Sequence, residues 1–220
     1  MSTCKLLVEG KGDQDFFSTY CELIIGKNKV EVYPPTKIDN NSGDGWGNLI
    51  NNLPIILASL EDNSTEKLGI ILDADYPPDN SGGFSQRHNK VTEKLLEMGY
   101  VIPNNPKYQQ GDIFTHADGL PNVGLWIMPN HQNDGMLEDF VENLITDTTQ
   151  SSLLQHAVEA INNLPNKLFN SQLHTSKAKV FTWRAWQHKP GCSLSRALHK
   201  NILDRNQASN FEAWLTNTFK

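Results

Sequence analysis

A continuous apolar segment near the middle of the chain, Leu68-Gly-Ile-Ile-Leu-Asp-Ala-Asp75, limits the folds open to this protein. It contains β-branched residues and is followed by the turn-forming sequence Tyr76-Pro-Pro-Asp-Asn-Ser-Gly-Gly83. A short apolar run of this kind is typical of a strand buried on both faces of a parallel sheet. Such sheets bind their ligands at the carboxyl ends of the strands. The residues that follow Leu72 are therefore expected at a ligand-binding edge.

Asp73 and Asp75 are the charged residues at this strand end. Side chains two residues apart point the same way while the chain stays extended, so the two carboxylates should lie together. Like charges this close repel one another and are commonly stabilised by a cation. Carboxylate oxygens suit Mg²⁺ or Mn²⁺. The alternative is that both aspartates are solvated acids of a surface loop.

Alternating strands and helices are predicted over the first two thirds of the chain. The predicted strands are 4–9, 29–33, 68–73 and 122–129, and the predicted helices are 13–26, 49–60, 85–98 and 136–145. Residues 36–45 and 100–121 are expected as loops, the second with room for a short edge strand. This order predicts an α/β fold with a Rossmann-like parallel sheet, right-handed crossovers and helices on both faces. Pro54 is expected near the first turn of its helix or at a kink.

The remaining third of the chain is predicted to be helical, with helices at 153–164, 176–187, 194–203 and 211–219. No linker or repeat divides the sequence, so residues 1–220 are predicted to form one domain. Residues 1–146 would be the α/β core and 147–220 a helical, basic extension packed on it. Residues 1–165 carry 10 Lys and Arg against 23 Asp and Glu, whereas residues 166–220 carry 9 against 2. This asymmetry is expected if the first part binds metal and the second a polyanion, or if the two parts simply attract each other.

The composition also indicates where the protein works. No run of 18 apolar residues is present, so no transmembrane helix is expected. The N-terminal sequence lacks the apolar core of a signal peptide. Cys4, Cys21 and Cys192 are odd in number and widely spaced, which favours the reducing cytoplasm over a disulfide framework or a zinc ribbon.

Acidic residues follow three of the predicted strands. Glu9 ends the first, Asp73 and Asp75 end the third, and Glu138 lies just beyond the last, at the start of a helix. The carboxyl ends of parallel strands share one edge of a sheet, so acids far apart in sequence should converge there. Glu142, one helical turn after Glu138, is expected in solvent. The convergence of separate acids strengthens the prediction of a metal site.

The residues at these strand ends resemble a known domain. Val8-Glu-Gly-Lys-Gly-Asp13 after the first strand, together with Asp73-Ala-Asp75, is similar to the Toprim domain of type IA and II topoisomerases, bacterial primases and OLD-family nucleases. The resemblance covers roughly residues 4–146. The sequences from Met128 to Phe140 and from Ser176 to Trp186 resemble a stand-alone Toprim-related family closer to the OLD nucleases than to topoisomerases.

The resemblance implies roles for individual residues. Glu9 would bind metal or act in acid–base catalysis, Asp73 and Asp75 would be Mg²⁺ ligands, and Glu138 would help to hold a second ion. A lysine of the C-terminal part, Lys177 or Lys179, would assist phosphodiester cleavage. No topoisomerase tyrosine, primase zinc domain or OLD ATPase domain is recognisable. The implied activity is therefore divalent-metal-dependent phosphodiester cleavage of nucleic acid, and any coupling to ATP would need a partner ATPase.

Basic residues complete the predicted site. Lys11 follows a glycine near a helix N-terminus, where free backbone N–H groups could help it to hold a phosphate, although it could equally be a solvated loop lysine. Asp13 is expected to cap that helix. Lys177, Arg184 and Trp183 are predicted to contact nucleic acid, the tryptophan by stacking on a base, although helical spacing also favours a core position for it.

Two other functional classes are weaker on the sequence. A non-catalytic Toprim module that binds nucleic acid or a partner ATPase would keep the fold without cleaving. A phosphomonoesterase of the haloacid-dehalogenase type also uses an Asp-x-Asp strand, but there the pair ends the first strand, not the third. His116 and His131 are expected in loops and lack partners at the spacing of a zinc site.

Overall fold

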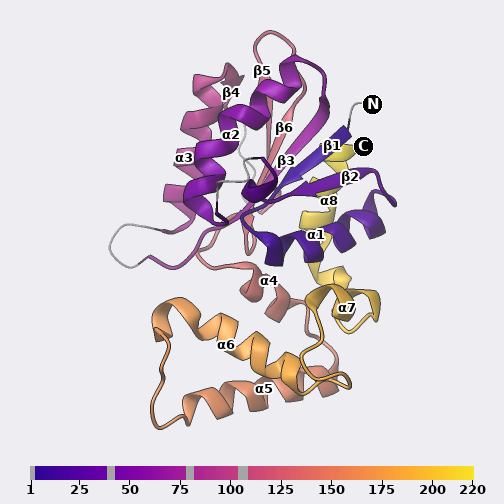
Figure 1. The fold of residues 1–220 in the computed structure, drawn as a ribbon. Helices are drawn as coiled ribbons and strands as arrows, with labels where there is room; N and C mark the ends of the chain where they lie inside the picture. The colour runs from indigo at the N-terminus through magenta and orange to yellow at the C-terminus, as the bar shows by residue number, and fades with distance from the viewer. Residues whose placement is uncertain (1–2, 39–42, 78–81, 104–108) are drawn as a thin grey trace.

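The computed structural model describes residues 3–38, 43–77, 82–103 and 109–220 (Figure 1). Within those ranges the chain forms a six-stranded, mostly parallel sheet flanked by helices, which confirms the predicted α/β class. Parts of three predicted loops, at residues 39–42, 78–81 and 104–108, lie outside the described residues. In the described parts no helix is both long enough and apolar enough to cross a membrane.

The sheet has the strand order β2-β1-β3-β6-β5-β4. β1 (Thr3–Leu7) pairs in parallel with β2 (Val30–Tyr33) and with β3 (Thr65–Asp73), and β3 pairs in parallel with β6 (Val123–Met128). β3 is central and almost wholly buried, as its apolar sequence predicts. The ends of β1, β3 and β6 therefore lie at one edge of the sheet, which is where the predicted acids follow.

The sheet extends beyond the four predicted parallel strands. The segment 100–121 contributes two strands, β4 (Tyr100–Val101) and β5 (Asp112–His116), where at most one short strand was expected. β5 runs antiparallel to β6, and β4 runs antiparallel to β5. His116 consequently ends a strand rather than lying in a loop. β5 is stabilised by pairing with β6, and its own short sequence does not predict this tertiary contact.

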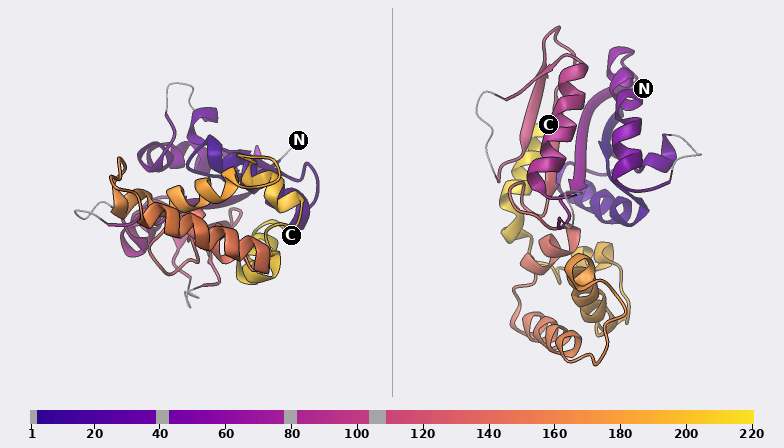
Figure 2. Two further views of the ribbon diagram at one scale, coloured as in Figure 1. Left: turned by 90° about the horizontal axis from the view of Figure 1, so that it is seen from below. Right: turned by 90° about the vertical axis from the view of Figure 1, so that its left-hand side faces the viewer.

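Helices cover both faces of the sheet (Figures 1 and 2). On one face lie α2 (Trp46–Glu61) and α3 (Phe84–Glu97), which pack against Leu68, Ile70 and Leu125. On the other face lie α1 (Lys11–Ile24) and α8 (Ser209–Phe219), which pack against Leu6 and Ile71. Pro54 lies in the interior of α2, so of the two positions expected for it the first turn is excluded. The sheet residues alternate between the two cores, as the two-residue period of a strand requires.

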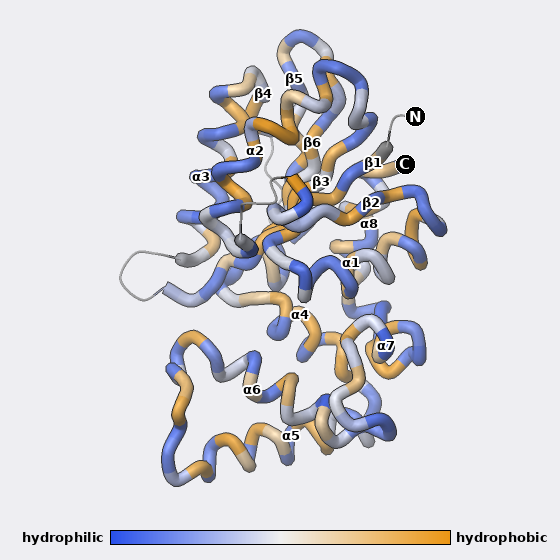
Figure 3. The backbone as a smooth tube through the Cα atoms, in the orientation of Figure 1, coloured by the Kyte–Doolittle hydropathy of each residue, from blue (hydrophilic) through white to orange (hydrophobic). Residues whose placement is uncertain are grey.

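The C-terminal third is helical as predicted, although three of its four predicted helices begin two to five residues earlier than expected. After α4 (Leu137–Asn143) come α5 (Thr148–Asn162), α6 (Ser171–Ala185) and α7 (Leu194–His199), followed by the short 3-10 turn Arg205–Ala208. In Figures 1 and 2, α5 and α6 lie beyond the carboxyl edge of the sheet, on the far side of α4. Figure 3 shows that α6 alternates between hydrophobic and hydrophilic residues along its length. A continuous apolar cluster joins α4, α5 and α6 to the sheet through α1 and α8.

The final helix is part of the central sandwich. α8 returns to the sheet and packs closely over glycines of its two central strands. A Cβ at Gly124 would lie 2.4 Å from the hydroxyl of Thr218, and one at Gly69 would lie 2.9 Å from the ring of Phe219. Glycine is required at both positions because α8 lies so close to the strands. The extension predicted from residue 147 therefore ends in a helix that covers the sheet.

Candidate metal site at the carboxyl edge of the sheet

Glu9 and Asp73 meet at the carboxyl edge, as predicted from their strand-end positions. Glu9 follows β1 and Asp73 is the last residue of β3, which are neighbouring strands. The backbone N–H of Asp73 donates to Oε1 of Glu9 at 2.9 Å. Two acids 64 positions apart in sequence are therefore in contact. This contact confirms the proximity on which the predicted site depends.

Burial and mutual repulsion make both carboxyl groups unusual acids. Burial, followed by the charge of Asp75, raises the pKa of Glu9 to about 7, although the Asp73 N–H and Arg87 oppose the shift. Burial, followed by the charges of Glu9, Asp13 and Asp75, raises the pKa of Asp73 well above its usual range. These groups hold more negative charge in a small desolvated volume than protein alone readily stabilises. A bound cation would relieve the repulsion.

Asp75 does not take the position that the sequence predicts. The chain leaves the extended conformation after Asp73, and Asp75 has a φ of +60° and pairs through its backbone with Gly135. The argument from strand alternation is therefore wrong for this pair. The Asp75 carboxylate accepts from Nη2 of Arg87 at 2.7 Å, and its side chain is 35% exposed. Asp75 is close enough to raise the pKa of Glu9, but it already has a cationic partner.

Two more acids complete the group that we call the acid cluster: Glu9, Asp13, Asp73, Asp75 and Glu138. Asp13 does not cap α1 from the N-cap position, which Gly10 occupies; it lies at the third helical residue and accepts from the Gly10 N–H at 3.1 Å. Burial, followed by the charge of Glu138, raises the pKa of Asp13 to about 6. Burial also raises the pKa of Glu138, an effect that the charge of Lys177 opposes. Asp13 therefore belongs to the acid cluster. The sequence analysis gave it only a helix-capping role and so did not place it in the site.

Two neighbouring acids hold the edge together through hydrogen bonds. Asp139 accepts from the backbone of Met136 at 2.8 Å, from the hydroxyl of Tyr76 at 2.8 Å and from that of Ser176 at 2.6 Å. It thereby ties the segment after β3 to the start of α4 and to the middle of α6. Asp134 accepts from the first N–H of α3, at Phe84. These bonds fix the elements that carry Asp73, Asp75 and Glu138.

The predicted basic residues fall into different environments. Lys11 is exposed at the start of α1, where its backbone N–H donates to Asp44 at 3.0 Å. Lys177 is exposed and lies near Glu138 and Asp13. Lys179 instead forms an ion pair with Glu142 at 3.2 Å. The expectation that Glu142 is solvated is therefore wrong, and the Lys179 ammonium is already engaged.

The prediction that Trp183 stacks on a base is wrong for this structure. Its side chain is 0% exposed, and its indole N–H donates to Gln150 of α5 at 3.0 Å. Burial between α6 and α5 leaves no ring face for a ligand. Arg184 lies at the next position, with its guanidinium 4.9 Å from the ring centroid of Phe181. The exposed aromatic side chain beside Arg184 is therefore Phe181, to which the sequence reasoning gave no role.

The donor set of the acid cluster fits a hard divalent cation in chemistry, because it consists of carboxylate oxygens. Its carboxylate oxygens lie farther apart than the ligand atoms around a bound ion. Among the described residues, three ligand atoms lie within 4.8 Å of one another only at His88, Asp112 and His131. One oxygen of Asp73 also accepts from the N–H of Leu137 at 2.9 Å. Glu9 and Asp73 are the acids that lie in contact, with Asp13 and Glu138 nearby, whereas Asp75 is paired with Arg87.

The second group, His88, Asp112 and His131, was not predicted from the sequence. One oxygen of Asp112 lies 2.7 Å from Nε2 of His88 and 3.1 Å from Nε2 of His131. His131, expected in a loop, is buried, and its Nδ1 accepts the N–H of Ile127 at 3.1 Å. That bond assigns the ring proton to Nε2, which donates to Asp112. A metal ion bound to Nε2 of His131 would displace the hydrogen bond to Asp112. In this structure the three residues therefore form a hydrogen-bonded group.

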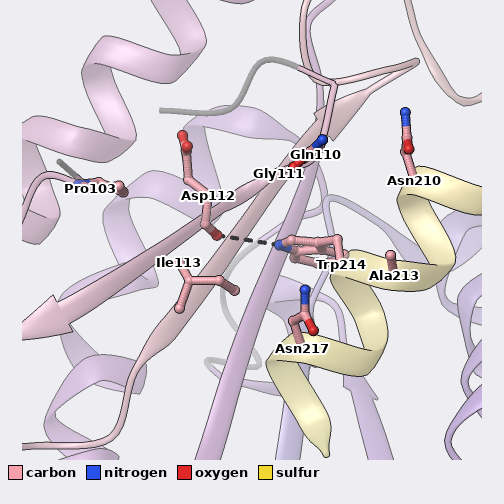
Figure 4. Close-up of a pocket in the computed structure, with 9 residues that line it drawn as sticks. All are labelled: Pro103, Gln110, Gly111, Asp112, Ile113, Asn210, Ala213, Trp214 and Asn217. Atoms are coloured by element: carbon pink, nitrogen blue, oxygen red, sulfur yellow. Dashed lines mark hydrogen bonds between the residues drawn. The ribbon is translucent and has the colours of Figure 1, made fainter. Parts of the chain in front are cut away.

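Electrostatics agree with this assignment. Burial by itself would raise the pKa of Asp112, but the hydrogen bonds from His131 and His88 hold it well below its usual range. Burial lowers the pKa of His131, so the neutral ring is favoured. A cavity of about 400 Å³ lies beside this group. At its edge the backbone oxygen of Asp112 accepts from the indole N–H of Trp214 at 3.3 Å. Figure 4 shows that the Asp112 carboxylate points away from Trp214. This cavity contains none of the acid cluster.

The fold and the site together define a class: an α/β protein with a half-buried acid cluster at the carboxyl edge of a mostly parallel sheet. The chain matches, over residues 3–220, the model of the family described as "Protein of unknown function (DUF3226)". It belongs to that family. No curated protein and no solved structure matches the chain.

Proposed function

We propose that this protein is a Mg²⁺- or Mn²⁺-dependent phosphodiesterase that cleaves nucleic acid with a Toprim-type site. The observation that carries the proposal is the contact between Glu9 and the Asp73 backbone inside a half-buried group of five acids. Such a group favours a divalent cation over any neutral ligand. The resemblance of the strand-end sequences to the Toprim domain supports the same chemistry.

Glu9, Asp73 and Glu138 would hold the metal. When bound, a divalent ion lowers the pKa of water and neutralises charge on a phosphate oxygen. Lys177 lines the same cavity as Asp75, at the border of the acid cluster, and would contact the phosphate. Arg87 lines this cavity too, but its guanidinium is buried and paired with Asp75. Lys11 is exposed at the start of α1 and would add a positive charge there, while its own backbone N–H already donates to Asp44. Lys179 is less suited to contact substrate because it is paired with Glu142.

A nicking assay tests the proposal. Supercoiled DNA and a folded RNA are incubated with protein and Mn²⁺, and the wild type is compared with Asp73→Asn. The matched control is Glu66→Gln, which removes an exposed carboxylate from the opposite end of the same strand. We expect cleavage in the wild type and in the control, and its loss in Asp73→Asn. Cleavage that survives Asp73→Asn, or that is lost equally in the control, would overturn the metal-site assignment.

One observation favours a second function, that of a non-catalytic module. Asp75 is neutralised by Arg87, and no three carboxylates of the acid cluster, all of whose members are described, lie as close as the His88 group. A module of this kind would bind nucleic acid or a partner ATPase without cleaving. Nucleic-acid binding with no cleavage in Mg²⁺ or Mn²⁺ would support it.

All three cysteines are free thiols, in keeping with a proposed cytoplasmic location.

A further inference from the structure

We infer that one side of α6 binds single-stranded nucleic acid and leads it to the acid cluster. Four residues form this side, which we call the α6 stripe: His174, Lys177, Phe181 and Arg184. Their spacing of three, four and three residues places them on one face of a helix. The inference rests on the proposed function, because it names the class of substrate that the same site would receive.

The α6 stripe lies on α6 directly beside a row of buried residues. Ser176, Val180 and Trp183 precede Lys177, Phe181 and Arg184 by one residue each, and all three are buried. His174 and Lys177 are exposed, and Phe181 is 56% exposed. The helix is therefore anchored along one side by its packing against α4 and α5, and it presents the adjacent side to solvent.

The start of the α6 stripe lies close to the acid cluster. His174 and Lys177 line a cavity of about 220 Å³ together with Arg87 and Asp75. The stripe is thus continuous with the proposed metal site. Its cations complement a polyanion, and they lie in the basic region of an otherwise acidic chain.

Phe181 indicates which form of nucleic acid fits. The ring of Phe181 is 56% exposed and is held beside the guanidinium of Arg184. Nε of Arg184 also donates to the backbone oxygen of Cys192 at 2.6 Å, so the pair is fixed in place. An aromatic ring flanked by cations is the arrangement on which unpaired bases stack. Bases in a duplex are already stacked on each other and cannot use it.

A binding assay without metal separates this inference from the cleavage proposal. Fluorescence anisotropy in EDTA would compare single-stranded DNA and RNA oligonucleotides of mixed sequence with a duplex of the same length. We expect either single strand to bind more tightly than the duplex. Phe181→Ala should weaken single-strand binding about 5- to 100-fold. Lys177→Gln should weaken binding and reduce its salt dependence by about one phosphate contact.

Leu168→Ser is the matched control, because Leu168 is fully exposed in the same region but lies outside α6. It should leave binding unchanged. Phe181 is an exposed residue, and circular dichroism spectra that match the wild type would show that its substitution leaves the fold intact. The inference is overturned if Phe181→Ala binds like the wild type, if the control weakens binding equally, or if duplex binds as tightly as both single strands. Single-strand binding with no cleavage in Mn²⁺ would instead refute only the phosphodiesterase.

Discussion

Replacing Glu9 with Gln should stabilise the metal-free protein at high pH. The pKa of Glu9 rises from its ordinary 4.5 to about 7 in the folded state. The folded protein therefore holds a proton that the unfolded chain releases, so stability falls as pH rises from about 4.5 to 7. The shift of roughly 2.5 units corresponds to about 3 kcal/mol of lost stability at pH 8. Gln carries no charge, and its oxygen can still accept from the Asp73 N–H.

Urea unfolding in EDTA at pH 5 and pH 8 would measure this effect. We expect Glu9→Gln to exceed the wild type by about 3 kcal/mol at pH 8 and by about 1 kcal/mol or less at pH 5. Glu66→Gln, which removes an exposed carboxylate elsewhere on the sheet, should show no such pH-dependent gain. Mn²⁺ should stabilise the wild type and leave Glu9→Gln almost unaffected. A variant that is less stable than the wild type at both pH values would refute the reasoning.

Three further substitutions test the surroundings of the site by urea unfolding. Asp112→Asn should cost about 2 kcal/mol at pH 7, because two histidines lose a buried anion. The cost should shrink as pH falls, since the lowered pKa of Asp112 makes its stabilisation disappear in acid. Arg87→Gln should cost about 2 kcal/mol by leaving Asp75 unpaired, and Asp75→Asn should recover part of it in the double variant. Gly124→Ala should cost about 1–3 kcal/mol, less when combined with Thr218→Ala, which removes the clashing hydroxyl.

Much of the fold follows from local sequence patterns. The four strands predicted from apolar runs and alternation are present, and each of the eight predicted helices overlaps one in the structure. The meeting of Glu9 and Asp73 also follows, because parallel pairing of β1 with β3 brings their carboxyl ends together. Residues that follow parallel strands can thus be placed together from the sequence, because the carboxyl ends of parallel strands lie at one edge of the sheet.

Conformation at single residues could not be predicted in this way. The extended pattern of β3 does not reveal that Asp75 turns into a positive φ and pairs with Arg87. Helical spacing places Trp183 and Phe181 on neighbouring sides of α6 but does not say which side α5 covers. Packing buries Trp183 and exposes Phe181, so the stacking role that we propose belongs to Phe181 and not to Trp183.

The histidine group is determined by tertiary structure alone. His88, Asp112 and His131 come from a helix, an antiparallel strand and the segment after β6, with no characteristic spacing between them. They meet because β5 inserts beside β6, a pairing between residues distant in sequence. Periodicity in the chain reports which residues avoid water and which strands carry acids at their ends. The partner of each buried charge is settled only when separate elements pack, because hydrogen bonds and ion pairs depend on distances that no local pattern contains.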